Sequence, residues 1–553
     1  MTKTVTHLIL VLLFTTGLSG KLAAQTFEAE DATYSDGLIV ETALAGYSGS
    51  GYVGNFANDN DLLSFHLSLD KAGYYDLTLG YAAPLGEKTN NISINGNRSE
   101  FTVAESHSFQ EKTMGKVRLK QGDNVIEITK SWGWFYVDYL KVTVNNDPQT
   151  TFNLPELVTP HASENTLKLY AFLKDHFQKK VISGVMTLNS FDESDWLKEQ
   201  TGKEPALLGL DFLHCNRNYS WYDDYTPVND AKTWYNKNGI PAISWHWRDP
   251  SRETEAFYTD ETSFDVSKID DETSPEYQAM LNDIDYIAGL LKELATDHIP
   301  ILWRPLHEAS GGWFWWGAHG PDACKKLWRV LFDRLVNHHQ LNNLIWVWTT
   351  DNREDNLDWY PGDEYVDILG VDIYAEAGDF GSQYLTFDQL KNDFEGQKMI
   401  TLSECGIVPD PDRLVEDQAG WSWFMPWYGD FVRSADYNPL SHWEAVLNHA
   451  YVITLDEMPN LREYVTSSHS VEVEPNDAFQ LYIDPARRLL RINPANQHER
   501  YDVSIFNATG CCLFTQRRLA AAQEIPVGAF ARGLLVVKLE TSSAPVAYKL
   551  INR

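Results

Sequence analysis

The chain has 553 residues, which is long for one ordinary domain and predicts three or four domains at ~150 residues each. Its 45 basic and 78 acidic residues give a net charge of -33, which would repel nucleic-acid phosphates and anionic membrane surfaces. No nucleic-acid partner is therefore expected. The aromatic content of 13%, with 19 tryptophans, fits carbohydrate binding, although large barrels also use many aromatic residues.

Residues 1–24 have the pattern of a cleaved secretory signal peptide. Lys3 precedes an apolar run from residue 8 to residue 18, and small residues end at Ala23 and Ala24. This run is shorter than the ~20 residues of a membrane span, and no later segment is long and free enough of charge to serve as one. We therefore predict a protein without a membrane span that is secreted, periplasmic or held on a bacterial cell surface.

Residues 25–146 alternate between apolar and polar side chains, as in the segments 74–79 and 124–128. This period of two is typical of half-buried strands, and several such strands in succession predict a β-sandwich. Residues 145–148 (Asn-Asn-Asp-Pro) form a predicted linker. From Ala162 the pattern changes to amphipathic helices that alternate with short apolar strands, which marks a domain boundary.

Eight apolar segments within residues 155–465 predict the strands of a (β/α)8 TIM barrel. They span residues 181–185, 206–210, 241–245, 299–303, 344–348, 366–373, 399–403 and 423–427. Polar residues gather at their carboxyl ends, namely Asp211, His246, His307, Glu308, Asp351, Asp372, Tyr374 and Glu404. Because such barrels carry their chemistry at these ends, the side chains are expected to converge at one mouth. Each residue alone could simply cap a strand.

The β pattern returns beyond residue 474. Segments 489–492, 501–506 and 534–539 are rich in Leu, Val and Ile, which predicts a small C-terminal β-domain over residues 474–553. The predicted fold class is therefore a multidomain chain. A central (β/α)8 barrel is flanked by an N-terminal β-sandwich and a small C-terminal β-domain.

Residues 303–317 combine charged groups with flat aromatic rings. The apolar strand is followed at once by Arg304, His307 and Glu308, a trio that packing alone does not require. Four aromatic residues in succession, flanked by glycines, would then form a wall beside the carboxyl group, and sugar faces stack on such rings. They are Trp313, Phe314, Trp315 and Trp316. The alternative is a salt-bridged glutamate beside an aromatic core cluster.

A second carboxyl group, that of Glu404, comes directly after the apolar strand 399–403, three barrel strands beyond the strand that leads to Glu308. Glycoside hydrolysis requires such a pair, because the leaving oxygen needs a proton while the anomeric carbon needs a nucleophile or an activated water. The two carboxyl groups lie ~5–5.5 Å apart in retaining enzymes and ~6.5–9.5 Å apart in inverting ones. No phosphate loop, zinc spacing or Ser-His-Asp order is evident, so we predict no catalytic metal or cofactor.

The catalytic motifs resemble those of glycoside hydrolase family 26, a family dominated by endo-β-1,4-mannanases. The resemblance covers roughly residues 155–465 and includes the segments 244–246, 304–308, 312–317, 370–374, 403–404 and 423–427. It implies a retaining enzyme that hydrolyses mannan, galactomannan or glucomannan by double displacement. It assigns Glu308, after strand four, as acid/base and Glu404, after strand seven, as nucleophile.

Other functions stay open beside this one. The family also contains β-1,3-xylanases, mixed-linkage glucanases and exo-mannanases that release mannobiose. A protein of a different class, a non-catalytic polysaccharide-binding surface protein with a degenerate barrel, is disfavoured because both carboxyl groups are present.

The resemblance also assigns roles to the residues around the pair. Glu308 must stay protonated near neutral pH, which burial among aromatic rings favours. Glu404 must stay ionised, and the natural donors to its carboxylate are Arg304 and the Tyr374 hydroxyl.

Substrate contacts are expected from four further side chains. His246 and Asp372 would bond sugar hydroxyls, while Trp313 and Trp427 would stack on pyranose faces. His307 is expected to position its neighbours. His246 could instead be a core histidine, and the tryptophans that follow Trp313 could simply pack beneath the site.

The segments 27–31, 49–54 and 135–140 resemble a family 35 carbohydrate-binding module, with family 6 as its close relative. Such modules carry a structural calcium, and the resemblance implies Glu28, Glu30 and Asp138 as its ligands. Solvated acids at strand ends are the alternative. Trp132 and Trp134 precede the last strand of this domain and are nominated for stacking on mannan, although they could equally be core residues.

The segments 503–510 and 548–551 resemble the sorting domain of the bacterial type IX secretion system. The usual Gly-x-Tyr strand opening is replaced by Gly533-Leu534-Leu535, so the match is looser. The resemblance implies a domain that is removed or used for surface attachment and has no catalytic part. The expected partner of the whole chain is β-mannan polysaccharide, and the chain is expected to act as a monomer.

Overall fold

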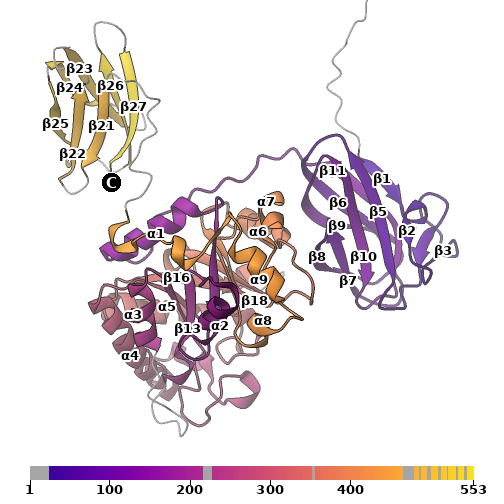
Figure 1. Ribbon diagram of the computed structural model, residues 1–553. Helices are drawn as coiled ribbons and strands as arrows, with labels where there is room; N and C mark the ends of the chain where they lie inside the picture. Colours follow the sequence, from indigo (N-terminus) through magenta and orange to yellow (C-terminus); the bar gives the residue numbers. More distant parts are fainter. Residues whose placement is uncertain are drawn as a thin grey trace, which may run out of the picture.

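The computed structural model describes residues 24–215, 227–350, 355–464 and 479–552, the last range with gaps at 485–486, 495–499, 508–511, 520, 531–532 and 541–544. The described residues form a β-sandwich, a parallel barrel and a small β-domain in chain order (Figure 1). The predicted signal peptide, except for Ala24, and Asp351 lie outside the described residues. Within the described part, no helix has the length and apolar character needed to cross a membrane.

The sandwich consists of two antiparallel sheets. One sheet contains β1 (Gln25–Glu28), β3 (Ile39–Glu41), β4 (Tyr52–Gly54), β6 (Gly73–Ala83), β9 (Ser106–Leu119) and β11 (Tyr136–Val144). The other contains β2 (Thr33–Tyr34), β5 (Leu62–Leu69), β7 (Lys88–Ile94), β8 (Asn97–Val103) and β10 (Gly122–Lys130). In β10, Ile126 and Ile128 face the core while Glu127 between them is half-exposed, as the period of two predicts.

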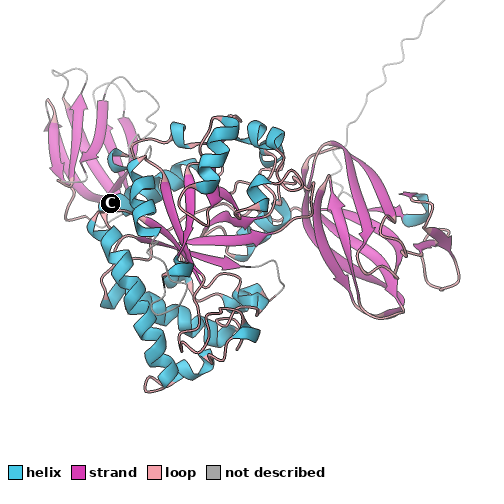
Figure 2. Cartoon of the chain, turned by 60° about the horizontal axis from the view of Figure 1, so that its bottom comes forward, coloured by secondary structure: helices cyan, strands magenta, loops and turns pink. Residues whose placement is uncertain are grey.

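Eight parallel strands close the barrel, and Figure 2 shows helices covering them on the outside. In order, the strands are β12 (Val181–Met186), β13 (Leu207–Asp211), β14 (Ile240–Trp245), β15 (Ile301–Pro305), β16 (Leu344–Thr350), β17 (Ile368–Ile373), β18 (Met399–Cys405) and β19 (Trp423–Pro426). Pairing of β12 with both β19 and β13 completes the circle, and the short β20 (Val452–Ile453) also pairs with β12. The predicted barrel is confirmed.

Several helices of this domain begin at residues typical of helix N-termini. The helices of the domain are α1 (Glu164–His176), α2 (Asp192–Thr201), α3 (Pro227–Asn236), α4 (Pro275–Thr296), α5 (Pro321–Phe332), α6 (Tyr384–Asp393), α7 (Pro411–Glu416), α8 (Asp430–Arg433) and α9 (Leu440–Leu447). For example, the Ser274 hydroxyl accepts a hydrogen bond from the backbone N–H of Tyr277 and caps α4, which has proline at its first position.

Strands β15 and β18 extend further than their apolar runs predict. Arg304 lies inside β15, and Glu404 lies inside β18 rather than after it, paired with Asp372 of β17. These charged side chains are tolerated in buried strands because they neutralise one another across the barrel. The strand boundaries therefore depend on ion pairing, which an apolar run does not reveal.

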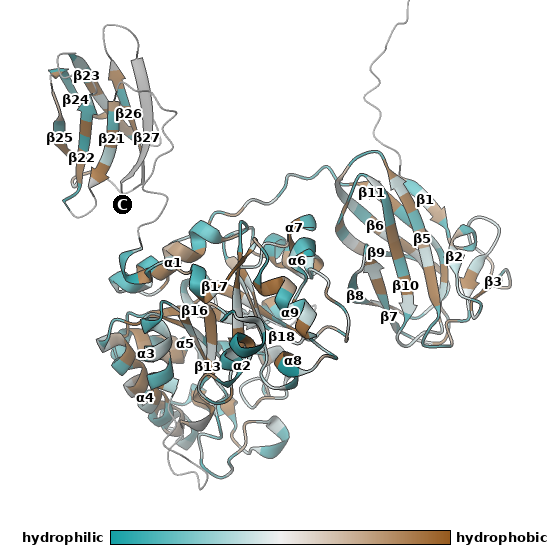
Figure 3. Cartoon of the chain, viewed as in Figure 1, coloured by the Kyte–Doolittle hydropathy of each residue, from teal (hydrophilic) through white to brown (hydrophobic). Residues whose placement is uncertain are grey.

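The core of the barrel consists of strand side chains that are buried on both faces. β14, β16 and β19 are buried at every position, and Figure 3 shows hydrophobic residues along the barrel strands. Tryptophans fill much of this interior: Trp245, Trp303, Trp346 and Trp423 are almost completely inaccessible to solvent. Many of the tryptophans that suggested sugar binding therefore serve packing.

The C-terminal β-domain has two small antiparallel sheets. One contains β21 (Phe479–Asp484), β22 (Leu489–Pro494) and β25 (Gln523–Pro526). The other contains β23 (Tyr501–Asn507), β24 (Cys512–Leu519), β26 (Gly533–Glu540) and β27 (Pro545–Asn552). Alternate residues such as Leu490, Val503 and Val537 form a separate apolar core, which confirms the predicted third domain. The predicted boundary between residues 465 and 474 lies outside the described residues.

Candidate active site

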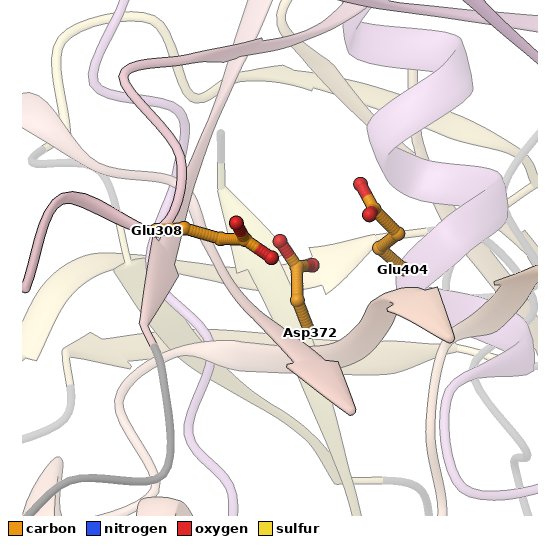
Figure 4. A group of neighbouring side chains, drawn as sticks. All are labelled: Glu308, Asp372 and Glu404. Carbon is orange, nitrogen blue, oxygen red and sulfur yellow. The ribbon is translucent and has the colours of Figure 1, made fainter. Parts of the chain in front are cut away.

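Three carboxyl groups meet at the carboxyl ends of the barrel strands. Glu308 follows β15, Asp372 lies in β17 and Glu404 in β18, and one oxygen of each lies within 4.8 Å of the others. Figure 4 shows the three side chains projecting into the same space. Retaining glycosidases hold their two carboxyl groups ~5–5.5 Å apart and inverting ones ~6.5–9.5 Å apart, so this arrangement favours retention.

Glu404 is buried and accepts two charge-stabilising hydrogen bonds. Arg304 Nη2 donates to Oε2 at 2.5 Å, and the Tyr374 hydroxyl donates to Oε1. Burial disfavours the charge of Arg304, but the carboxylates of Asp372 and Glu404 outweigh it and raise the pKa of this guanidinium. Both donors stabilise the negative charge of Glu404, as the sequence predicted for a nucleophile.

Glu308 has the opposite environment. Burial and the nearby charge of Glu404 raise its pKa to about 7, while Arg304 and a 2.9 Å hydrogen bond from Trp313 Nε1 oppose the rise. This carboxyl group is thus available as a proton donor near neutral pH. Its backbone is in the left-handed region with φ of 52°, and Leu306 also has φ of 50°. Such strain in non-glycine residues is typical of functional sites.

Asp372 is engaged by protein donors on both carboxyl oxygens. Arg304 Nη1 donates to Oδ2 at 2.9 Å, and the Ser403 hydroxyl donates to Oδ1 at 2.7 Å. Burial first, and the charges of Glu404 and Glu308 second, raise the pKa of Asp372 well above its usual range, against the effect of Arg304. The structure shows Asp372 orienting Arg304. A hydrogen bond from a sugar hydroxyl to Asp372 remains a prediction. The sugar hydroxyl would share an oxygen of this carboxyl group with Arg304 or Ser403.

A chain of hydrogen bonds joins Asp211, His246 and His307. Asp211 accepts from the backbone N–H of His246 at 3.0 Å and contacts Nδ1 of its ring at 2.5 Å. The Nε2 atoms of His246 and His307 lie 3.2 Å apart. Burial and the charge of Arg304 lower the pKa of His307 well below its usual range, which keeps this ring neutral.

This chain bears on the two roles considered for His246, a sugar contact and a core histidine. Both of its ring nitrogens contact protein groups, so it is not a core histidine satisfied only by backbone, and a bond to a sugar hydroxyl would have to replace one of these contacts. The role of His307 as a positioning residue fits its burial and its contact with His246. The sequence marks Asp211 only as a polar residue at a strand end, because its partner lies on the neighbouring strand.

The aromatic segment divides into an exposed ring and a buried support. Trp313 is 43% exposed, whereas Trp315 and Trp316 are completely buried and donate to the backbone oxygens of Trp247 and His307. The predicted distinction among these tryptophans is thus consistent with their burial. Half-buried Trp427 lies on another side of the site, with its ring 5.6 Å from that of His246.

Tyr258 is a further exposed aromatic residue beside the site, and its sequence context does not mark it. Its ring is 42% exposed and stacks on Phe314 at 5.6 Å, next to Trp313. The loop that carries it is fastened to the aromatic segment, since Thr259 donates to the carbonyl oxygens of Gly312 and Trp313 at 2.7 Å. No local motif marks Tyr258, because only the fold brings this loop to the site.

The sequence of the barrel decides the family. Residues 158–457 match the profile of glycosyl hydrolase family 26, and residues 25–145 match that of the family 35 carbohydrate binding module. This chain belongs to glycosyl hydrolase family 26. The predicted resemblances to these two families are confirmed, and the protein is a glycoside hydrolase with an N-terminal family 35 module. The resemblance of the C-terminal β-domain to a sorting domain stays a prediction.

The matches to curated relatives span most of this family 26 protein. A mannan endo-1,4-beta-mannosidase of Thermothelomyces thermophilus is 39% identical over 459 residues, which cover 79% of this chain and 91% of that protein. The mannan endo-1,4-beta-mannosidase B of a Piromyces species is 34% identical over 78% of this chain and 77% of its own length.

Solved structures agree with this assignment. The GH26-CBM35 beta-(1,4)-mannanase of Podospora anserina is 38% identical with a TM-score of 0.55, covering 79% of this chain and 99% of its own. A beta-mannanase from a symbiotic protist of the termite Reticulitermes speratus, complexed with gluco-manno-oligosaccharide, is 45% identical with a TM-score of 0.54. It covers 56% of this chain and 99% of its own.

The two nominated tryptophans of the family 35 module are surface residues. Trp132 is 68% exposed and Trp134 is 48% exposed, so neither belongs to the core. Trp134 has a left-handed backbone with φ of 55°, and the Lys88 ammonium group lies 5.7 Å from the ring centre of Trp132. Both rings are accessible to a ligand, and contact with sugar remains a prediction.

Glu28, Glu30 and Asp138 converge on the loop that precedes β4. Asp138 accepts from the backbone N–H of Ser48 at 2.9 Å, and Glu28 accepts from the Ser48 hydroxyl at 2.5 Å. Oε2 of Glu30 is buried and has no hydrogen-bond partner among the described residues. Burial, with the charges of Glu28 and Glu30 also contributing, raises the pKa of Asp138 to about 6. An unpartnered carboxylate oxygen beside two further acids is chemically suited to a hard cation, and calcium at these residues stays a prediction.

Proposed function

We propose that this family 26 protein is a retaining endo-β-1,4-mannanase. The observation that carries the proposal is the contrast between two adjacent carboxyl groups. Glu404 receives hydrogen bonds from Arg304 and Tyr374, whereas Glu308 has a pKa raised to about 7. A glycosidase needs one ionised nucleophile and one protonated acid on either side of the scissile bond, and this pair supplies both.

In the first step, Glu404 attacks the anomeric carbon while Glu308 gives its proton to the leaving oxygen. The glycosidic carbon–oxygen bond breaks, and a covalent bond forms between the sugar and Glu404. In the second step, the Glu308 carboxylate takes a proton from water as the water oxygen attacks the same carbon. Glu404 leaves as a carboxylate, and the two inversions together retain the β-configuration.

The substrate is assigned from the relatives. The curated relatives at 39% and 34% identity are named mannan endo-1,4-beta-mannosidases, and each match covers more than three quarters of this chain. The alternatives within the family are mannobiose release from chain ends, β-1,3-xylanase activity and mixed-linkage glucanase activity. A non-catalytic role is disfavoured, because the complete carboxyl pair is held in a geometry suited to catalysis.

A product profile tests this proposal. The full-length protein is incubated with galactomannan, glucomannan, β-1,3-xylan and mixed-linkage glucan, and the products are separated while NMR follows their anomeric configuration. We expect oligosaccharides of several lengths from the mannans, released first as β-anomers. Initial release of α-anomers would contradict retention, mannobiose alone would indicate exo action, and products from xylan or glucan alone would reassign the substrate.

The flanking regions have supporting roles in this proposal. The family 35 module would bind polysaccharide through Trp132 and Trp134 and raise the local concentration of substrate. Calcium would stabilise that module at Glu28, Glu30 and Asp138. The segment 1–24 would direct export, and the C-terminal β-domain would serve sorting or surface attachment. The chain is proposed to act as a monomer.

A further inference from the structure

The family 35 module is joined to the catalytic domain by direct polar contacts as well as by the linker. The contacts involve residues on β6, β8 and β9 of the module. Their partners lie on α6, on the loop 374–383 that leads into it, and just after α7. The loop 374–383 begins at Tyr374, whose hydroxyl donates to the nucleophile Glu404.

The most buried contact is made by Asn97 of the module. Its Nδ2 atom donates to Asp417 at 2.9 Å, and its Oδ1 atom accepts from the backbone N–H and the hydroxyl of Ser382 at 2.9 and 2.8 Å. Trp421 Nε1 donates to the carbonyl oxygen of Ser382 from the barrel side at 2.9 Å. The end of the loop 374–383 is therefore held between the two domains. The module bonds the backbone N–H of Ser382, and the barrel bonds its carbonyl oxygen.

A second contact is made with the middle of α6. Arg118 of the module forms an ion pair with Asp388 at 3.1 Å, and their side chains are only 16% and 6% exposed. The Tyr74 hydroxyl donates to the same carboxylate at 3.1 Å and accepts from Arg118 at 2.7 Å. Removing one member of such a buried pair leaves the other charge unpaired, at a large cost in stability. This cost distinguishes the contact from a flexible tether.

A third contact reaches the loop itself. Arg98, the residue after Asn97, forms an ion pair with Glu376, two residues beyond Tyr374. The barrel supports the same segment from the other side, because Phe431 packs edge-on against the Tyr374 ring at 5.1 Å. Module and barrel thus hold the Tyr374 loop at both ends and from two sides.

We propose that the family 35 module is a structural part of the active site and not only a targeting unit. By docking through Asn97, Arg98 and Arg118 it holds the loop 374–383, and so keeps the Tyr374 hydroxyl on Glu404. The inference rests on the proposed roles of those two residues. It implies that undocking slows hydrolysis even of soluble oligosaccharides, which need no targeting. Asn97 and Arg98 are positioning residues in this scheme, since they act on Glu404 only through Tyr374.

The test uses the full chain with Asn97→Asp, which sets a carboxylate against Asp417 inside the interface. We expect kcat on a short soluble manno-oligosaccharide to fall by roughly tenfold with little change in KM, because the affected contact is to the nucleophile and not to substrate. Asn60→Asp makes the same chemical change at an exposed module position and serves as the matched control. Adding Asp417→Asn to Asn97→Asp restores an amide–carboxylate pair, and we expect it to restore kcat.

Hydrogen exchange gives a readout that does not depend on activity. In Asn97→Asp the backbone amides of residues 376–382 should exchange faster, while those of β18 stay protected. The inference is overturned if hydrogen exchange in this loop is the same in Asn97→Asp as in the wild type. It is also overturned if exchange becomes faster but kcat on the oligosaccharide does not change. If the wild-type protein cleaves no β-mannoside, the proposed function fails instead. The same comparison then uses whichever substrate the wild type hydrolyses, and an unchanged kcat there also overturns the inference.

Discussion

Arg304 of β15 bonds both Asp372 of β17 and Glu404 of β18, the two adjacent strands that face it across the barrel. Its Nη1 atom donates to Asp372 at 2.9 Å and its Nη2 atom donates to Glu404 at 2.5 Å, all within the buried interior. One guanidinium thereby fixes the orientation of the nucleophile and stabilises its charge. Glu308, just beyond the same strand, makes no ion pair with Arg304 and is free to carry the proton.

Loss of the Glu404 carboxylate should abolish double displacement. We expect Glu404→Ala to lower kcat by roughly 10⁴-fold, since the covalent intermediate can no longer form. Added azide should restore part of the rate and yield the α-glycosyl azide, because a single displacement inverts the anomeric carbon. Rates are measured on manno-oligosaccharides, with the exposed Glu199→Ala on α2 as control. Hydrolysis at the wild-type rate would reject Glu404 as nucleophile.

The pH dependence should report the protonation of Glu308. The acid must carry its proton to activate the leaving group, so kcat/KM should decline as pH rises through about 7, the value to which burial and Glu404 raise this pKa. The hydrogen bond from Trp313 lowers that pKa, so Trp313→Phe should move the alkaline limb to higher pH. Complete pH profiles of both proteins provide the measurement. An alkaline limb that does not move would show that another group controls it.

Calcium should stabilise the family 35 module through its acidic cluster. A chelator is expected to lower the melting temperature of the full-length protein, and excess calcium should reverse the change. Asp138→Ala should remove this response, since it deletes one of the three carboxylates of the cluster, to which the buried oxygen of Glu30 also belongs. Asp70→Ala changes an exposed acid of the same module and is the control. If the chelator leaves the melting temperature unchanged, the proposed calcium site is wrong.

Binding to insoluble mannan should depend on the exposed rings of the module. Trp132→Ala is expected to weaken retention on mannan by roughly tenfold, as hot-spot aromatic residues at binding surfaces do. A pull-down of the full-length protein with insoluble mannan measures the effect. Tyr34→Ala removes another exposed aromatic ring of the module and should retain wild-type binding. Equal retention of the two variants would show that the polysaccharide binds elsewhere.

Local patterns were sufficient for the architecture and for the central pair. Apolar runs located all eight barrel strands, because a parallel strand buried on both faces must be apolar along its length. Glu308 and Glu404 were recognisable because each lies within a few residues of the end of such a run, beside distinctive neighbours. Alternation at Ile126 and Ile128 likewise predicted the sandwich, whose two faces differ in exposure.

Relationships between distant segments were decided only by the tertiary structure. Arg304 extends its strand because partners from two other strands cancel its charge, and Asp211 fixes His246 across a strand ladder. The contact between Asn97 and Asp417 exists only once two domains are folded and docked. A hydrogen bond depends on distance and direction in space, whereas local sequence constrains only neighbours along the chain. The sequence by itself therefore determined the elements and the catalytic pair, and the fold decided what positions that pair.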